Sequence, residues 1–333
     1  MKDVNRSESR WVVAHCGSRD DYQLPIALHE SGQLHRFVTD WYSPLDSRIV
    51  DVMLKCLPER LRLELARRYR KELPSRLVKD VKLSGLLKSV FGTDALDTGL
   101  NRLVGECAAS VANASGSSLL ITSYYGWAAF PRVAKSTKKV LFQIHPHPWF
   151  LRKLYKTYQS ELDADAGFRD EAEMKASEEF LRCWGQESLD ADVVIAASSF
   201  TRQSLVNAGV REEKIHVVPY GVDGHIFRND VGTPSGIPKV LFVGQATVRK
   251  GFQNLLETWK RIGNRGAELH IVSGATAVMA GVNSSGTVVW HGRLALADLV
   301  ELMNRVDLLV LPSIAEGFGH VLLQSLSCGT PIL

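Results

Sequence analysis

The stretch "KVLFVGQATVRKGFQNLLETW" (residues 239–259) shows the pattern from which the fold is predicted. A short apolar run ends at a glycine, a polar turn follows, and an amphipathic helix then begins. Further apolar runs of this kind are "ELHIVSG" (268–274), "TVVWHG" (287–292) and "DLLVLPS" (307–313). Continuous apolar strands that alternate with helices are typical of a parallel sheet covered on both faces. A ligand would approach the small residues at the carboxyl ends of these strands.

The N-terminal half has the same character with longer insertions. Ser199 is the expected N-cap of a helix that follows a strand at 192–198. The chain of 333 residues is long for one core, and "GTPSGIP" (232–238) is a Pro- and Gly-rich break. We therefore predict an α/β protein of two Rossmann-like, doubly wound domains, residues 1–230 and 231–333. The other strands expected in the first domain are 11–17, 118–123, 139–145 and 214–221.

Composition excludes several classes of protein. Apolar residues make up 45% of the chain and charged residues 23%, which is ordinary for a globular enzyme. No apolar run approaches the ~18 residues that span a bilayer, and the polar start argues against a signal peptide. The five cysteines are scattered and form no Cys-x-x-Cys motif, which favours a reducing cytosol over a disulfide framework or a zinc site. We therefore expect a cytoplasmic protein.

One segment is strongly basic. Residues 57–82 hold nine Lys or Arg and four Asp or Glu, a net charge of +5, whereas the whole chain carries +4. The segment is either a solvated helix face or a basic amphipathic helix at the anionic inner face of a membrane. Nucleic-acid binding is not expected, because the chain shows no second basic patch with interleaved aromatic residues.

The last part of the chain, "PSIAEGFGHVLLQSLSCGTPIL" (312–333), combines an acid, a glycine-bracketed turn and a helix. Gly317 and Gly319 allow the backbone to approach a ligand closely, and the helix predicted to begin near Gly319 offers unpaired N–H groups to a diphosphate. The carboxylate of Glu316 could accept hydrogen bonds from sugar hydroxyls. The alternative is that Glu316 only complements the helix dipole.

The turn at 244–251 is the second candidate. Gly244 ends a strand, and Arg249 and Lys250 precede a helix. Two adjacent cations there suit a leaving diphosphate, whose negative charge grows as a glycosidic bond breaks. The alternative is a solvated pair of basic side chains.

Two candidates belong to the N-terminal half. His145, in "IHPHP" (144–148), follows a strand, and the prolines keep the turn from becoming helical. Gly17 ends the first strand and would allow an acceptor or donor to approach closely. A metal site would need a third ligand at proper spacing, and none is evident. A structural histidine is the alternative for His145.

Four motifs, in order, resemble the retaining glycosyltransferases of the GT-B fold, family 4. They are "LFQIHPHP" (141–148), "ADVVIAASSFTRQSLVNAGVREEKIHVVPYGVD" (191–223), residues 239–259 and residues 312–333. The resemblance is strong from about residue 190 onward. It implies two Rossmann-like domains that face a cleft, and sugar transfer from a nucleotide-sugar donor to an acceptor hydroxyl with retention and without a metal. The usual acceptors are surface polysaccharides or lipid-linked glycans.

The resemblance also implies roles for single residues. Glu316 and His145 would hold the transferred sugar, and Lys250 matches the family's lysine. The donor would also contact the 317–319 turn, which includes Phe318, and Gly292 and Arg293 of the "WHGRL" loop (290–294). Gln324 replaces the family's second glutamate, which holds the ribose, and Gln245 replaces an arginine. We therefore expect weaker or altered nucleotide binding, because neutral hydrogen bonds are weaker than charge-assisted ones.

Other readings remain open. The two glutamines and the early end of the chain motivate a binding module of the same fold without catalysis. An epimerase or a phosphorolytic enzyme is a third possibility. "GFGHVL" (317–322) lacks the third glycine of a dinucleotide fingerprint, and "DAD" (163–165) is a weak metal motif. A family member would continue beyond residue 333, so we expect an extended chain to be more stable.

Overall fold

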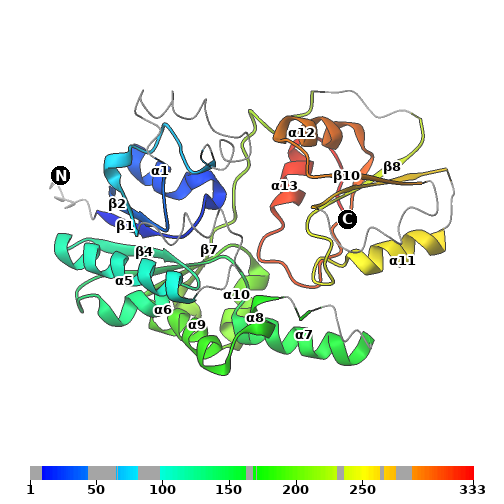
Figure 1. The fold of residues 1–333 in the computed structure, drawn as a ribbon. Helices are drawn as coiled ribbons and strands as arrows, with labels where there is room; N and C mark the ends of the chain where they lie inside the picture. The colour runs from blue at the N-terminus through cyan, green and yellow to red at the C-terminus, as the bar shows by residue number, and fades with distance from the viewer. Residues whose placement is uncertain are drawn as a thin grey trace, which may run out of the picture. The chain divides into compact units, whose positions relative to one another are not determined.

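The structure is a computed structural model, in which contacts divide the chain into two compact units, each an α/β layer structure (Figure 1). The first unit comprises residues 1–148, 176–196 and 202–217, and the second comprises 149–175, 197–201 and 218–333. The residues that the structure describes are 10–43, 65, 67–81, 98–162, 168–169, 171–230, 236–262, 266–274 and 287–333.

The first unit is built on a seven-stranded parallel sheet in the order β3-β2-β1-β4-β5-β6-β7. All five predicted strands are present, with earlier ends than expected, whereas β2 and β3 were not predicted. The strands are β1 (Trp11–Ala14), β2 (Leu34–Thr39), β3 (Val78–Asp80), β4 (Ser118–Thr122), β5 (Lys139–Gln143), β6 (Val193–Ala196) and β7 (Ile215–Val217).

Both faces of this sheet are covered. Val12 and Ala14 of β1 join a core cluster with the alanines of α5, whereas Val13 joins a second cluster with Ile26 of α1. Successive side chains of a strand point to opposite faces, so α5 and α1 cover different sides of the sheet. The helices are α1 (Gln23–Glu30), α5 (Thr98–Ser115), α6 (Gly126–Ala129), α9 (Glu178–Asp190) and α10 (Ser199–Asn207), whose first turn falls in the second unit.

The predicted cap of α10 was wrong by one residue. Ser199 is the first helical residue, and the hydroxyl of Ser198 accepts a hydrogen bond from the backbone N–H of Thr201 at 3.1 Å. Two adjacent serines made the choice ambiguous, because either side chain can cap a helix.

The second unit contains a four-stranded parallel sheet in the order β10-β9-β8-β11. Phe252 of α11 and Met303 of α12 are fully buried in its core, and these helices lie on opposite sides of the strands (Figure 1). The strands are β8 (Lys239–Val243), β9 (Glu268–Val272), β10 (Val288–Gly292) and β11 (Leu308–Leu309). The helices are α7 (Pro148–Leu162), α8 (Ala172–Lys175), α11 (Phe252–Ile262), α12 (Leu296–Arg305) and α13 (His320–Ser327).

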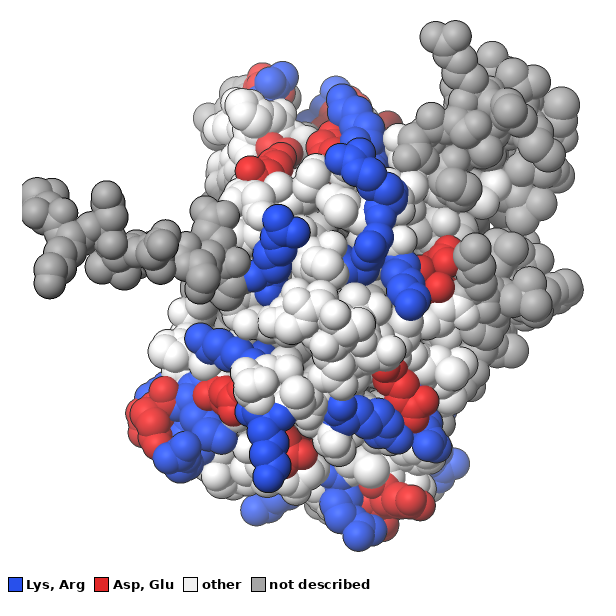
Figure 2. All heavy atoms as spheres, turned by 90° about the vertical axis from the view of Figure 1, so that its left-hand side faces the viewer, with Lys and Arg blue, Asp and Glu red and all other residues white. Residues whose placement is uncertain are grey.

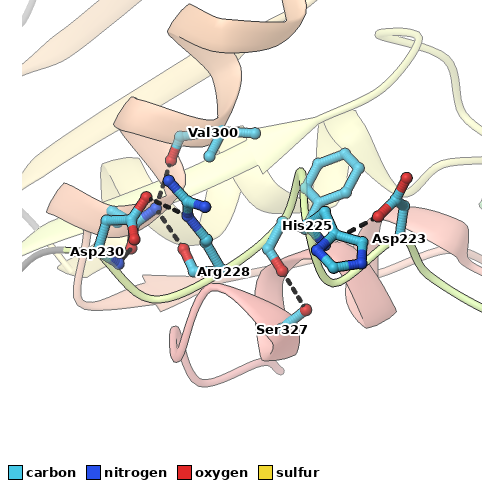
Figure 3. A network of polar contacts seen from close by, with 8 residues as sticks. Asp223, His225, Arg228, Asp230, Val300 and Ser327 are labelled. Atoms are coloured by element: carbon cyan, nitrogen blue, oxygen red, sulfur yellow. Dashed lines mark hydrogen bonds and ion pairs between the residues drawn. The ribbon is translucent and has the colours of Figure 1, made fainter.

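A polar network explains why residues 218–230 belong to the second unit (Figure 3). The side-chain amide of Asn304, on α12, donates to the carbonyl of Arg228 and accepts from the backbone N–H of Asp230, both at 3.2 Å. The hydroxyl of Ser327, on α13, donates to the carbonyl of Phe227. This division differs from the predicted single boundary at 230/231, because the contacts that fix this segment come from residues far ahead in the chain. Residues 231–235 of the predicted break lie outside the described residues.

The basic segment 57–82 is described in part. Residues 57–64, 66 and 82 lie outside the described residues, as does the "DAD" motif at 163–165. Arg68 pairs with Asp40 at 2.9 Å, and Arg70 pairs with Asp21. Figure 2 shows Lys and Arg side chains in a band on the face seen from the left of Figure 1. Exposed basic residues of the segment are Arg67, Lys71, Arg76 and Lys79.

Among the helices in the described part of the chain, none is long and apolar enough to span a bilayer.

Candidate functional site

Two loops of the second unit, 244–251 and 312–319, lie against each other. They follow the neighbouring strands β8 and β11. The backbone N–H of Ile314 donates to the carbonyl of Arg249 at 2.8 Å. Gly251 has a φ of +67°, and a Cβ there would lie 1.9 Å from the carbonyl oxygen of Pro312. Only glycine fits this approach, so Gly251 is a residue of the site that sequence analysis did not single out.

The contact between the loops brings two predicted residues together. The ammonium group of Lys250 forms an ion pair with the carboxylate of Glu316. The side chains are 16% and 25% exposed, so the pair is accessible but partly shielded from water. A cation and a hydrogen-bond acceptor thus stand side by side at the carboxyl edge of the sheet.

Arg249 is also paired, which the sequence did not indicate. Its Nε lies 3.0 Å from Oε2 of Glu171, and its Nη1 lies 3.4 Å from the carbonyl oxygen of Ala315. Burial raises the pKa of Glu171, and the charge of Arg249 offsets part of that rise. Glu171 was missed because it lies 78 residues before Arg249, in a part of the chain with weak resemblance to the family.

A small apolar cluster of the second unit packs against the two loops that carry the Lys250–Glu316 and Arg249–Glu171 pairs. Val248 and Ala315, one from each loop, pack with Leu151 and Tyr155 of α7 and with Phe168. α7 and Phe168 therefore pack against both loops, and Glu171, close to Phe168 in the chain, pairs with Arg249.

The turn at 317–319 leads into α13 as predicted. Gly319 is the N-cap residue and provides no side-chain cap, and its carbonyl accepts from the backbone N–H of Leu322 at 2.8 Å, so the N–H groups before Leu322 are the ones that face a ligand. The carbonyl of Gly317 accepts from the hydroxyl of Thr201 at 3.3 Å, and the ring of Phe318 lies 5.4 Å from that of Tyr220. The turn is thus held in place while the helix end stays uncapped.

Hydroxyl groups form a further set of candidates that sequence analysis missed. Within the described ranges, the side-chain oxygens of Thr247, Ser273 and Ser313 are buried and have no hydrogen-bond partner. They follow β8, β9 and β11, which are neighbours in the sheet. Buried unpaired hydroxyls are uncommon and costly, so their gathering at one edge is consistent with a polar ligand that approaches there.

The remaining predicted donor-side residues occupy the same edge or α13. Gly244 follows β8, and the side chain of Gln245 is exposed. Gly292 ends β10 with a φ of +67°, and the guanidinium of Arg293 lies over Gly274, where a Cβ would be 3.1 Å from Nε. Gln324 lies on α13 and is partly buried.

A histidine pair beside this edge was also missed. Nδ1 of His270 lies 2.8 Å from Nε2 of His291, and Nε2 of His270 lies 3.1 Å from the carboxylate of Glu268. Burial and the neighbouring His270 lower the pKa of His291. Within the described residues, no group of at least three His, Cys, Asp or Glu side chains could hold a metal ion.

The candidates of the first unit have different surroundings. The N–H of Gly17 donates to the carboxylate of Asp40 at 2.9 Å, in a backbone conformation with φ of +77°. The adjacent His15 is buried, which lowers its pKa to about 3. His145 follows β5, and its ring stacks on Tyr124 with centroids 6.2 Å apart. His147 is buried, which lowers its pKa to about 4.

Comparison with known proteins identifies part of the second unit. Residues 237–333 match the family model described as "Glycosyl transferases group 1". This segment is similar to group 1 glycosyl transferases. It contains both loops of the candidate site, including Lys250, Glu316 and the N-terminus of α13.

Solved glycosyltransferases show the fold. The structure superposes on sucrose-phosphate synthase of Thermosynechococcus elongatus with a TM-score of 0.66 at 17% identity, covering 97% of this chain and 80% of that one. Anabaena Alr3699/HepE, solved in complex with UDP and glucose, gives a TM-score of 0.57 at 16% identity, with 97% and 80% covered. The chain therefore has the GT-B fold.

The curated relatives match this chain over only part of their length. A D-inositol 3-phosphate glycosyltransferase of Nocardiopsis dassonvillei is 28% identical over an alignment of 189 residues that covers 49% of this chain and 42% of that protein. A mannosyltransferase of Mycolicibacterium hassiacum, named MMP alpha-(1->4)-mannosyltransferase, is 27% identical over 150 residues, 43% of this chain and 36% of the relative. The matches thus span less than half of each relative's length.

Proposed function

We propose that the protein transfers a sugar from a nucleotide-sugar donor to an acceptor hydroxyl with retention and without a metal, as a family 4 glycosyltransferase of the hexosyltransferase type. The observation that carries this proposal is the Lys250–Glu316 pair beside the uncapped α13 N-terminus, within the segment that matches group 1 glycosyl transferases. A cation and free amide N–H groups suit a diphosphate, and the adjacent carboxylate suits sugar hydroxyls.

In this proposal, the second unit stabilises the leaving group. Lys250 and the first-turn N–H groups of α13 neutralise the charge that develops on the diphosphate as the glycosidic bond breaks, which is commonly the largest catalytic term. Glu316 accepts hydrogen bonds from the sugar, and His145, chosen by its match to the family's histidine segment, is the second proposed sugar contact. Glu316 must exchange part of its contact with Lys250 for contacts with the donor.

The proposed donor contacts extend along the same edge. The base and ribose would lie near Gln324 and the loop with Gly292 and Arg293. The 317–319 turn, Gly244 and Gln245 would line the diphosphate. Arg249 would contribute its charge without direct contact with the diphosphate, because Glu171 and the carbonyl of Ala315 already occupy part of its guanidinium.

The acceptor is proposed to be a polysaccharide or a lipid-linked glycan. The basic segment 57–82 would hold the protein at the anionic inner face of a membrane, where lipid-linked acceptors are found. The exposed side chains of Arg67, Lys71, Arg76 and Lys79 support this part of the proposal.

A binding module with weak or no catalysis is the second candidate. The observation that favours it is that both cations of the 244–251 loop are already paired with carboxylates, Arg249 with Glu171 and Lys250 with Glu316. Gln245 and Gln324 add to this reading, because each replaces a charged residue of the family pattern.

A thermal-shift screen combined with a turnover assay tests both candidates. UDP, ADP and GDP and their glucose or mannose conjugates are added to the full chain, and sugar release or transfer is measured in parallel. The proposed enzyme predicts a raised melting temperature for one nucleotide and release of its sugar, because ligand binding stabilises the folded state. Binding without release supports the module, and the absence of any shift contradicts both.

A further inference from the structure

The first unit contains a buried carboxyl group that the proposed function does not use. Glu187 lies on α9 and is 1% exposed. Its Oε1 accepts the backbone N–H of Tyr124 at 2.6 Å, and its Oε2 accepts that of Trp127 at 3.1 Å. The N–H of Gly126 also faces this carboxyl group. A buried carboxyl group is costly, so its retention here reflects the amide groups that it satisfies.

These bonds hold a strained turn. Tyr124 has a φ of +75°, in the left-handed region that residues other than glycine seldom adopt. The indole N–H of Trp127 donates to the carbonyl of Tyr124 at 3.0 Å and closes the turn. A Cβ on Gly126 would lie 3.1 Å from the Glu187 carboxyl, so glycine allows the close approach. Strain of this kind persists only where the surroundings enforce it, and it is found most often at functional sites.

The turn places the ring of Tyr124 against His145. Their rings are stacked with centroids 6.2 Å apart and an interplanar angle of 28°. Tyr124 also contacts Trp184, which lies one turn before Glu187 on α9. The two rings meet edge-on with their centroids 4.8 Å apart. The side-chain amide of Gln143 donates to the carbonyl of His145 at 2.8 Å and holds its backbone.

We propose that Glu187 is a positioning residue that acts through Tyr124 on His145. By accepting the amide hydrogens of the 124–127 turn, it keeps Tyr124 in the left-handed conformation in which its ring orients the imidazole. The catalytic meaning of this chain of contacts rests on the proposed function, in which His145 contacts the transferred sugar.

The variant Glu187→Gln tests the inference with little change of volume. The amide NH2 group cannot accept a hydrogen bond, so one backbone N–H of the turn loses its partner. The imidazole proton resonances of His145 are compared by NMR between the wild type, Glu187→Gln and the control Glu179→Gln, an exposed glutamate of the same helix. We expect Glu187→Gln to shift the His145 resonances, and the control to leave them unchanged.

Turnover separates positioning from a merely structural role. With the nucleotide sugar that gives activity among UDP-glucose, ADP-glucose and GDP-mannose, Glu187→Gln should lower kcat about tenfold or more, because misplaced groups lose near-attack geometry. The KM for that donor should stay within about twofold, because the proposed donor contacts are mostly in the second unit. Tyr124→Phe should retain activity, because the ring remains, whereas Tyr124→Gly should lose it even though glycine adopts this φ freely.

The outcomes distinguish this inference from the proposed function. Unchanged His145 resonances and kcat in Glu187→Gln would overturn the inference and leave the proposed function standing. If Glu187→Gln does not fold, the variant Tyr124→Gly provides the test. Full activity of Tyr124→Gly would overturn the inference, whether or not the His145 resonances shift. If the wild type neither binds nor cleaves any of the three nucleotide sugars, the proposed function fails, and the catalytic meaning of Glu187 fails with it.

Discussion

The strand ends of the two units are organised by opposite means. In the second unit, the ion pair of Lys250 with Glu316 joins the loops at 244–251 and 312–319, and the pair of Arg249 with Glu171 ties the first loop to an earlier part of the chain; both pairs are partly exposed. In the first unit, the turn at 124–127 is held by one fully buried carboxyl group that faces backbone amides. A partly exposed ion pair can exchange one partner for a ligand at lower cost than a fully buried group that satisfies backbone amides can be disturbed.

This difference leads us to expect that the two units contribute differently to the proposed reaction. In the proposed function, the charged side chains of the second unit bind the diphosphate, and the first unit holds His145 in a fixed geometry. Substitutions in the second unit should therefore act on ligand binding and leaving-group chemistry, and those in the first unit on geometry.

The largest effect is expected for Lys250→Ala. In the proposed reaction, loss of the ammonium group would remove the charge that stabilises the leaving diphosphate, so turnover should fall about 100-fold or more. The control is Lys260→Ala, an exposed lysine of α11. Release of the nucleoside diphosphate is the measurement, and similar rates for the two variants would contradict the proposed role of Lys250.

Gly251→Ala tests how tightly the two loops are joined. The new Cβ would meet the carbonyl of Pro312, and the left-handed φ adds strain, so the free energy of unfolding should fall by about 3 kcal/mol or more. Gly266→Ala is a matched control, because Gly266 has a φ of +75° with no atom within 4 Å of its would-be Cβ. That control should cost about 1 kcal/mol. Chemical denaturation measures both, and equal losses would show that the close approach is unimportant.

Glu187 should make stability depend on pH. Burial raises its pKa from 4.5 to about 8, against the backbone N–H groups of Tyr124, Trp127 and Gly126, which lower it. The folded state therefore keeps a proton that the unfolded state releases between these values, so this group costs stability as pH rises through the window.

The wild type should lose up to about 1.4 kcal/mol of unfolding free energy per pH unit relative to Glu187→Gln between pH 5 and about pH 8. Urea denaturation across this range measures the difference. Parallel curves for the two proteins would show that Glu187 does not titrate in this window.

The smallest effect is expected for Glu171→Gln. This change removes the carboxylate that neutralises Arg249, so the affinity for a nucleoside diphosphate should rise about fivefold, as fits a partly buried ion pair. Because burial raises the pKa of Glu171, mildly acidic solution should mimic the variant, and the difference between the two proteins should shrink as pH falls. Calorimetry with Glu257→Gln as control measures it, and weaker binding in Glu171→Gln would indicate that Glu171 is needed to place Arg249.

Local patterns predicted much of the fold. Apolar runs marked the strands of the second unit, and the glycine turn marked the start of α13, because both depend on neighbouring residues. The sheet edge formed by β2 and β3 was missed, since β2 ("LHRFVT") mixes polar with apolar residues. The assignment of 149–175 to the second unit depends on contacts of α7 with Val248 and Ala315, which lie far later in the chain and which no local pattern encodes.

The same limit applies to the site. Lys250 and Glu316 were selected from separate motifs, and the structure places them in contact. Glu171 and Glu187 carry no motif of their own. Each is defined by its partner, Arg249 for Glu171 and the amides of the 124–127 turn for Glu187, and these partners are distant in sequence.

Hydrogen exchange of the full chain, with and without UDP, ADP or GDP, tests the central claim most directly. If the strand ends of the second unit bind the diphosphate, one of these nucleotides will slow exchange in residues 244–251 and at the start of α13, and Lys250→Ala will abolish that protection. Protection confined to other segments, or identical protection in Lys250→Ala, would contradict the account.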